Sequence, residues 1–159
     1  MRCCLSPVVG ILRRLGYRLC LAWWKLSKPI TVGVRVVLVR EGKVLLVFHS
    51  YQDAWYLPGG GVKTGETLKE AIAREAAEEV GASLGEIRLL GVYDNFYEGK
   101  SDHVMVFICD FLNMTGETDG EIARWGFFEP DRLPEAVSPG TRRRLREYVA
   151  DQGPYVGRW

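Results

Sequence analysis

The chain has 159 residues, of which 47% are hydrophobic and 26% are charged, with 21 basic and 20 acidic residues. This length suits one globular domain, and the hydrophobic fraction excludes a disordered chain. A formal net charge of +1 excludes a protein that holds nucleic acid mainly through its overall charge.

The charges are unevenly distributed along the sequence. Residues 1–40 contain eight basic residues and no acidic residue, whereas residues 41–159 contain the other 13 basic residues and all 20 acidic residues, about −7 in total. The basic N-terminal part suits an anionic partner, and the acidic remainder suits cations.

Residues 1–28 are predicted to form a basic amphipathic helix that precedes a domain over residues 29–159. Its apolar side chains recur at steps of three and four residues: Leu12, Leu15, Leu19, Trp23 and Leu26. Basic residues and tryptophans suit the interface of an anionic membrane, with peripheral association of the protein. A helix that packs on its own domain or on a second subunit explains the same pattern. The sequence is therefore compatible with membrane association, with packing on the domain and with packing on a second subunit.

Cysteine usage and hydropathy favour a cytoplasmic protein. The four cysteines (Cys3, Cys4, Cys20 and Cys109) form no CxxC pair and no zinc-ligand spacing, which favours a reducing compartment without a disulfide framework. No run of 18 apolar residues is present, so the sequence predicts no membrane-spanning helix.

The predicted elements begin with a hairpin of the strands Thr31–Val39 and Lys43–Phe48, joined by Glu41-Gly42. A short strand, Trp55–Leu57, leads to Pro58 and three glycines. Helix formers over Thr67–Val80 predict a helix that ends at Gly81.

Further elements continue the alternation of strands and helices. They are the strands Ile87–Tyr93, His103–Leu112 and Ile122–Phe128, and the helix Pro139–Ala150. Mixed strands with interspersed helices predict an α/β sandwich, in which helices cover a central sheet.

Three glutamates of the first predicted helix are candidates for metal ligands. Glu75, Glu78 and Glu79 stand at positions i, i+3 and i+4, so their carboxylates share one helix face and repel one another. A divalent cation such as Mg²⁺ or Mn²⁺ prefers such oxygen ligands and would offset the repulsion. Arg74 is placed to orient the carboxylates. The alternative is a solvated acidic face, and the residues before the helix argue against it.

The segment from Gly60 to Ala82 resembles the Nudix box, whose pattern is G-x5-E-x7-R-E-U-x-E-E-x-G-U with U apolar. Glu66, Arg74 and the three glutamates fall at the fixed positions, as do Gly60 and Gly81. A chance match of seven fixed residues at one position is on the order of one in 10⁸. The two U positions hold alanines, which are smaller than the usual aliphatic residues.

The resemblance covers about residues 31–150 and implies a Nudix-type α/β/α sandwich with a mixed central sheet. It also implies a Mg²⁺-dependent hydrolase, with Mn²⁺ as an alternative, that cleaves a nucleoside diphosphate linked to another moiety. By position, Glu75, Glu78 and Glu79 match the family's metal ligands, with the Gly59 carbonyl as a further candidate. Glu66 and Arg74 match its supporting ion pair.

Hydrolysis of a pyrophosphate also needs a group that takes a proton from the attacking water. Glu75 is the expected base. Glu98 and Asp102, expected in a loop before the strand at His103, and Glu121 are outside candidates. A small-molecule nucleotide is the expected substrate, and nucleic acid is expected only as capped RNA. A catalytically idle module that binds nucleotide or RNA as a sensor is the alternative function.

Side chains outside the box give little information about the substrate. The aromatic candidates for stacking on a base are Trp55, Tyr93, Phe96 and Tyr97, each of which also suits ordinary packing. His49 and His103 are candidates for phosphate contacts. The run Arg142–Arg144 is either a phosphate or RNA patch or a solvated helix face.

Overall fold

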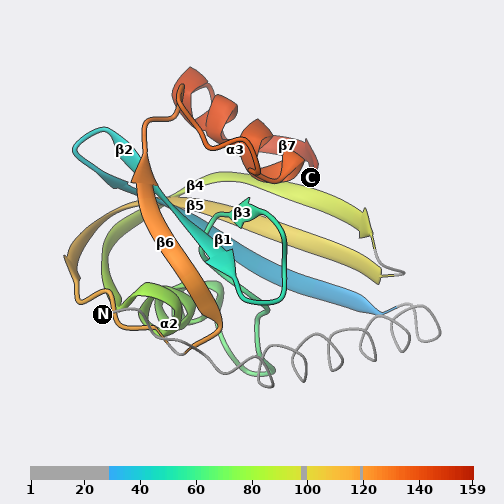
Figure 1. Ribbon diagram of the computed structural model, residues 1–159. Coiled ribbons are helices and arrows are strands. Elements are labelled where there is room, and N and C mark those ends of the chain that lie inside the picture. Colours follow the sequence, from blue (N-terminus) through green and yellow to red (C-terminus); the bar gives the residue numbers. More distant parts are fainter. Residues whose placement is uncertain (1–28, 98–99, 119) are drawn as a thin grey trace.

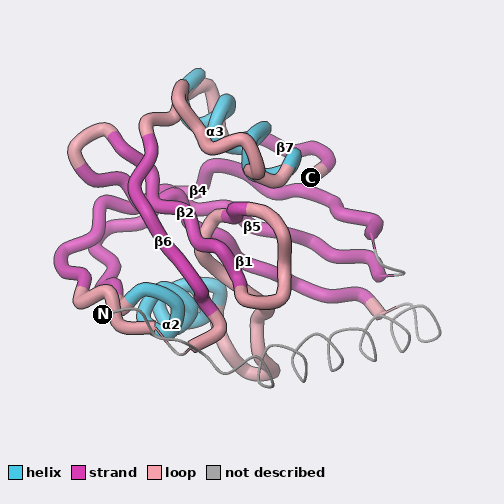
Figure 2. Tube along the Cα trace, in the orientation of Figure 1, coloured by secondary structure: helices cyan, strands magenta, loops and turns pink. Residues whose placement is uncertain are grey.

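The computed structural model describes residues 29–97, 100–118 and 120–159, and the predicted helix over residues 1–28 lies outside this part of the chain. Within the described residues, one mixed sheet carries a helix on each face (Figures 1 and 2). The strands are β1 (Ile30–Arg40), β2 (Lys43–His49), β3 (Trp55–Tyr56), β4 (Ala82–Tyr97), β5 (Lys100–Met114), β6 (Ile122–Phe128) and β7 (Tyr155–Arg158). The helices are α2 (Leu68–Val80) and α3 (Pro139–Ala150).

The strand order is β3-β2-β1-β5-β4-β7, and β6 pairs with β2 beside this path. Strand β1 is parallel to β5, and β4 is parallel to β7, whereas the other pairs are antiparallel. The mixed sheet and the two helices on opposite faces confirm the predicted fold class.

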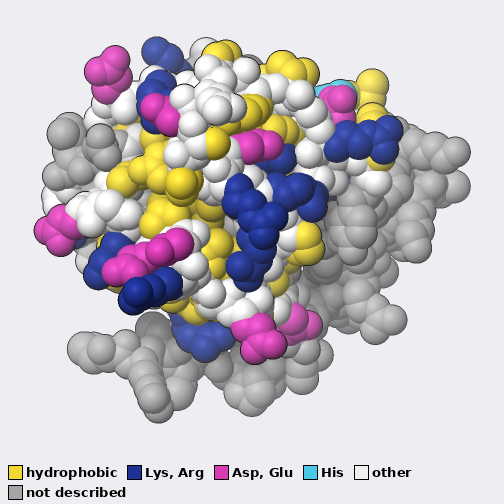
Figure 3. All heavy atoms as spheres, turned by 90° about the horizontal axis from the view of Figure 1, so that it is seen from above, with side chains coloured by type: hydrophobic (Ala, Val, Ile, Leu, Met, Phe, Trp, Pro, Cys, Tyr) yellow, Lys and Arg dark blue, Asp and Glu magenta, His cyan; other side chains and the backbone are white. Residues whose placement is uncertain are grey.

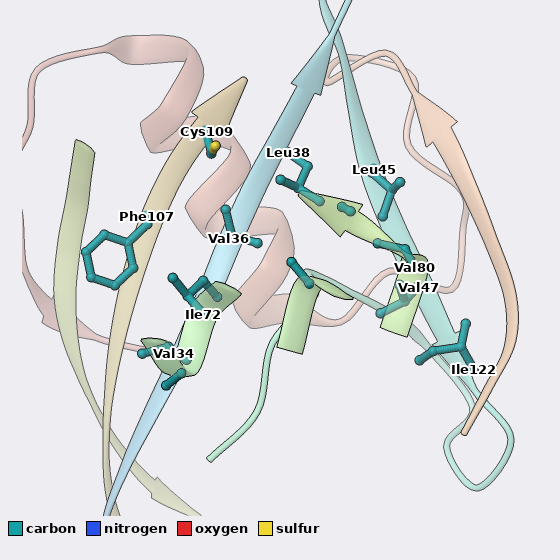
Figure 4. Close-up of a cluster of buried hydrophobic side chains, with 13 residues drawn as sticks. Val34, Val36, Leu38, Leu45, Val47, Ile72, Val80, Phe107, Cys109 and Ile122 are labelled. Atoms are coloured by element: carbon teal, nitrogen blue, oxygen red, sulfur yellow. The ribbon is translucent and has the colours of Figure 1, made fainter. Parts of the chain in front are cut away.

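Two apolar cores follow from the alternation of side chains along β1. Val34, Val36 and Leu38 are buried on the α2 side, where Ile72 and Val80 of the helix contact them (Figure 4). Val37 points to the opposite face and belongs to the cluster that contains Leu145 of α3. Because the period of a strand is two residues, a valine-rich strand can supply both cores at once.

Helix α2 begins and ends where the sequence predicts. The hydroxyl of Thr67 accepts from the Glu70 backbone N–H, and the Glu70 carboxylate accepts from the Thr67 backbone N–H, which forms a capping box. Gly81 adopts a left-handed conformation with φ of 63° and donates to the carbonyls of Ala76 and Ala77. These two ends fix the length of the helix that carries the box glutamates.

The predicted hairpin turn is also confirmed, since Glu41 and Gly42 have φ of 52° and 74°. Strands β4 and β5 extend beyond their predicted bounds, and β7 was not predicted. No helix in the described residues is long and apolar enough to span a bilayer. Cys109, the cysteine within the described part, is buried.

Candidate functional site

The glycine-rich loop before α2 pairs with the edge of β1. The backbone N–H of Val34 donates to the Gly60 carbonyl, and that of Val36 donates to the Pro58 carbonyl, both over 2.9 Å. Gly59 lies between the two acceptors, so its carbonyl is outside the pairing with β1. The loop is therefore held against the sheet and offers Gly59 toward the helix.

Two of the loop glycines leave no room for a side chain. Gly59 has φ of 133°, and a Cβ atom there would lie 2.2 Å from the Val34 carbonyl oxygen. A Cβ atom on Gly60 would lie 2.5 Å from Oε1 of Glu75. The Glu75 carboxylate thus packs directly on the backbone of the loop.

Arg74 gathers three of the box carboxylates. Its Nε and Nη2 donate to the two oxygens of Glu66 over 2.7 and 3.0 Å, as a bidentate pair. Its Nη1 donates to Glu75 over 2.7 Å and to Glu78 over 3.1 Å, and Nη2 also reaches the Gly61 carbonyl over 3.1 Å. One guanidinium therefore connects Glu75 and Glu78 of the helix with Glu66 and Gly61 of the preceding loop.

These contacts keep both partners of the main ion pair charged. The hydrogen bonds from Arg74, and next that from the Lys63 backbone N–H, lower the pKa of Glu66 to about 2. The hydrogen bond to Glu66 raises the pKa of Arg74 above its usual value, against the effect of partial desolvation. The pair is ionised throughout the neutral range.

Glu79 points to the other side of the loop. Its Oε2 accepts from the Gly59 backbone N–H over 2.8 Å, and its Oε1 lies 3.7 Å from Nε2 of His49. Both side chains are buried, and burial, followed by the charge of Arg35, lowers the pKa of His49 to about 4. His49 is therefore neutral near pH 7, and the charge on Glu79 is not cancelled by it.

The site has an excess of negative charge. Four carboxylates, those of Glu66, Glu75, Glu78 and Glu79, surround one guanidinium, which leaves a formal charge of −3. Among the described residues, no three His, Cys, Asp or Glu side chains are close enough together to bind one metal ion. The box carboxylates are instead hydrogen-bonded to Arg74 and to the Gly59 N–H. A divalent cation at this place would compete with Arg74 for Glu75 and Glu78. The oxygen-only donor set and its charge fit such a cation.

The structure brings Glu66, Arg74, Glu75 and Glu78 into one hydrogen-bonded group, with Glu79 and Gly59 paired beside it. Sequence reasoning missed the contact between His49 and Glu79. It places a strand-end histidine of β2 beside a helix residue 30 positions away, and sequence spacing does not reveal such a contact.

The predicted loop position of Asp102 is wrong. Asp102 lies within β5, and its carboxylate accepts from the Thr31 hydroxyl over 2.6 Å across the pair of β1 and β5. The strand begins earlier than predicted because it pairs with β4 from Lys100 onward. Glu98 lies outside the described residues, and Glu121 immediately precedes β6, where its carbonyl accepts from the Ser50 N–H.

Several substrate candidates have structural roles instead. Tyr93 is buried and donates to Glu147, so its ring is part of the core below α3. Arg142 donates to the Pro134 carbonyl, and Arg144 is buried and donates to the Arg158 carbonyl. Basic side chains still gather on the surface seen from the α3 side (Figure 3). The arginine run therefore serves mainly to hold backbone carbonyls.

Comparison with known proteins adds independent information about the family. The family model described as NUDIX domain matches residues 29–150. The MutT-like protein of Streptomyces ambofaciens is 32% identical over 132 residues, which cover 82% of this chain and 84% of that protein. The ADP-ribose pyrophosphatase of Methanocaldococcus jannaschii is 32% identical over 109 residues, which cover 65% of this chain and 64% of that enzyme.

A solved structure gives the same result for the fold. The crystal structure of UDP-X diphosphatase superposes with a TM-score of 0.69 at 30% sequence identity, and the match covers 79% of this chain and 66% of that chain. The match of the family model over most of the chain, the complete box and the fold agree with one another. This chain belongs to the Nudix family of hydrolases, and it is an enzyme.

Proposed function

We propose that the enzyme cleaves a pyrophosphate bond in a nucleoside diphosphate linked to another moiety, with Mg²⁺ or Mn²⁺ as its cofactor. The observation that carries the proposal is the group of four carboxylates on α2 and its preceding loop, which Arg74 and the Gly59 N–H hold. A diphosphate is a polyanion, and a site with a formal charge of −3 accepts it only together with cations.

The carboxylates of Glu75, Glu78 and Glu79 and the Gly59 carbonyl would hold the metal ion. A divalent ion bound there supplies positive charge to the phosphate oxygens and lowers the pKa of a bound water. The chain's own groups position these ligands: Arg74 holds Glu75 and Glu78, and the Gly59 N–H holds Glu79. Glu75 is the proposed base for the attacking water, because its carboxylate lies against the loop backbone at Gly60.

The names of the relatives support this class of substrate. The archaeal relative is named an ADP-ribose pyrophosphatase, and the solved structure is named a UDP-X diphosphatase. Both names describe cleavage of a diphosphate that is joined to a nucleoside. The complete box favours a hydrolase over an idle nucleotide or RNA sensor, and a cytoplasmic location stays a prediction from cysteine usage.

A screen for the nucleotide products by liquid chromatography tests the proposal, because cleavage of a diphosphate between two moieties gives two phosphorylated products and no free phosphate. Nucleotide sugars, ADP-ribose, dinucleoside polyphosphates and capped RNA are incubated with the full chain in Mg²⁺ or Mn²⁺. We expect turnover of at least one diphosphate, its loss in EDTA, and its return when metal is added. Hydrolysis of none of them by a folded protein that has bound Mn²⁺ would contradict the proposed activity.

Two variants test the ligand assignment. Glu78→Gln and Glu79→Gln keep the side-chain shape but remove the charge, so kcat should fall by on the order of 100-fold, with an unchanged circular dichroism spectrum. Binding of Mn²⁺, followed by electron paramagnetic resonance, should weaken in both variants. Glu86→Gln, an exposed position on β4, is the matched control. Equal kcat and equal Mn²⁺ affinity in all four proteins would contradict the assignment.

A further inference from the structure

The sheet has a large apolar area on the α2 side that the helix does not cover. Seven large apolar side chains are exposed among the described residues, and five of them share this face: Ile30, Val32, Leu89, Phe96 and Val156. The strand register places them together, because Val32 pairs with His103, Phe96 pairs with Ser101, and Val156 pairs with Val92. The five side chains therefore lie on β1, β4 and β7, with Ser101, His103 and Met105 of β5 between them on the same face.

The exposed fraction along β1 shows where the cover by α2 ends. On this face Val36 and Val34 are 0% exposed, Val32 is 38% exposed and Ile30 is 77% exposed. The ends of β1, β5 and β4 run on past the helix in Figure 1. Scattered apolar side chains on a surface are ordinary, but five on one continuous sheet face indicate a surface that another segment or molecule covers.

The chain itself supplies a candidate at the right place. The Pro29 carbonyl accepts from the Ser101 N–H over 2.9 Å, which fixes the start of β1 at the edge of the uncovered face. Residues 1–28 are joined to this point. A helix of 20 residues is about 30 Å long, and strands lie about 4.8 Å apart, so such a segment is long enough to cross four strands.

The pattern and charge of residues 1–28 also match the face. Their apolar stripe, from Leu12 to Leu26, could be buried against the valine, isoleucine and phenylalanine side chains of the sheet face. They contain six basic residues and no acidic one, whereas the 15 basic and 20 acidic residues of 29–159 leave that part at −5. On the same face, Oδ1 of Asp94 lies 2.9 Å from Nδ1 of His103, and Arg158 lies over the Phe96 ring.

We propose that residues 1–28 pack intramolecularly on the α2-side sheet face formed by β1, β5, β4 and β7. The tether gives this segment a high effective concentration at the face, which a second molecule does not have. The segment then acts as a structural part of the domain in the same layer as α2, and its apolar stripe is not free for a membrane.

Crosslinking in the full chain is the first test. Val156→Cys places a thiol on the uncovered face, and in a background with Cys3→Ser and Cys4→Ser the segment keeps Cys20 as its one thiol. A short bismaleimide should join the two within one monomer, as identified by mass spectrometry of the peptides. Val149→Cys is the matched control, because Val149 is also an exposed valine, at 64% against 89% for Val156, and lies on α3 across the sheet. The control should give at least a tenfold lower yield.

Thermal stability is the second test and needs no crosslink. Val156→Thr and Val32→Thr keep the branched shape, so on a bare face they should leave Tm unchanged. Under a packed segment each should lower Tm by about 3 °C, and Leu19→Ala combined with Val156→Thr should be less than additive. Val149→Thr should shift Tm by less than 1 °C, as expected of roughly neutral surface changes.

Three results would overturn the proposal. Links only between two chains, with a dimer on size exclusion, would assign the face to a second copy. A crosslink absent in buffer, together with sedimentation of the protein on anionic vesicles that salt reverses, would assign the segment to a membrane. Equal crosslink yields and equal Tm shifts for Val156 and Val149 would show that nothing covers the face.

Discussion

Arg74 controls the geometry of the site at the scale of single residues. Its guanidinium is shared among Glu66, Glu75 and Glu78, and the planar fork allows two parallel bonds to Glu66 while a third nitrogen serves the other two. An ammonium group has no such fork. The arrangement therefore depends on arginine itself rather than on positive charge alone.

Arg74→Ala should weaken Mn²⁺ affinity and kcat by about 10- to 100-fold, because the two glutamates lose the group that orients them. Arg74→Lys should recover only part of the loss. Calorimetric titration of Mn²⁺ and steady-state kinetics measure both effects. If Arg74 acts only as a competitor of the metal, the alanine variant will bind Mn²⁺ more tightly than the wild type, which would contradict this prediction.

The lowered pKa of Glu66 predicts a stability that depends on acid pH. The pKa falls from the ordinary 4.5 to about 2 in the folded state, so the ionised carboxylate stabilises the fold fully above pH 4.5. This contribution is lost as the pH falls through about 2. The urea midpoint of the wild type should exceed that of Glu66→Gln at pH 6, and the difference should shrink steadily toward pH 2. Glu86→Gln is the control, and a pH-independent difference for Glu66→Gln would contradict the prediction.

Much of the residue-scale site was predictable. The resemblance to the Nudix box implied an ion pair of Glu66 with Arg74, and the two side chains are hydrogen-bonded. The contact of Glu79 with Gly59 and His49 was not predictable in detail, since it depends on how the loop pairs with β1 and on where β2 ends.

At the scale of elements, the three glycines between β3 and α2 have three different surroundings. A side chain on Gly59 would meet the backbone of β1, one on Gly60 would meet the Glu75 carboxylate, and one on Gly61 would meet nothing within 4 Å. Only Gly59 has a positive φ among the three. We therefore expect Gly59 to matter mainly for stability and Gly60 mainly for catalysis.

The three alanine variants should therefore behave differently. Gly59→Ala should lower the free energy of unfolding by about 2 kcal/mol or more, through backbone strain and the clash with Val34. Gly60→Ala should fold but lose kcat on the order of 100-fold, because Glu75 is displaced. Gly61→Ala should resemble the wild type. Chemical denaturation and kinetics on the same three proteins check this order, and equal behaviour of Gly60→Ala and Gly61→Ala would contradict it.

Element prediction succeeded where local chemistry sets a boundary. Thr67 and Gly81 fix α2 through hydrogen bonds within a few residues, and Glu41-Gly42 fixes the turn of the hairpin. Strands β4 and β5 run into polar residues that have no strand signal of their own, such as Asp94, and they continue only because each is the other's partner. Strand β7 is short and exists through its pairing with β4.

At the scale of the whole molecule, Arg144 joins α3 to the sheet and to the C-terminal strand. Its guanidinium is buried, lies 3.7 Å from the centre of the Tyr93 ring, and donates to Glu147 and to the Arg158 carbonyl. Tyr93 in turn donates to Glu147 over 2.7 Å. One buried network therefore connects α3, β4 and β7.

Arg144→Met should destabilise the fold by about 3 kcal/mol, since it leaves Oε1 of Glu147 and the Arg158 carbonyl without their donor. Hydrogen exchange should become faster at β7 before it does at α2. Arg146→Met, exposed on the same helix, is the control and should change stability by less than about 0.5 kcal/mol. Equal urea midpoints for the two variants would show that the network is not needed.

The parallel pairing of β1 with β5 has a consequence for synthesis on the ribosome. Paired residues of the two strands, from Ile30 with Ser101 to Val39 with Asp110, are 71 positions apart in the sequence. Strand β1 therefore cannot complete its pairing with β5 until residue 110 has left the exit tunnel. At about 5 to 20 residues per second this interval lasts roughly 4 to 14 s. During it the valine-rich edge of β1 has no parallel partner, and the nascent chain is expected to be a client of ribosome-associated chaperones.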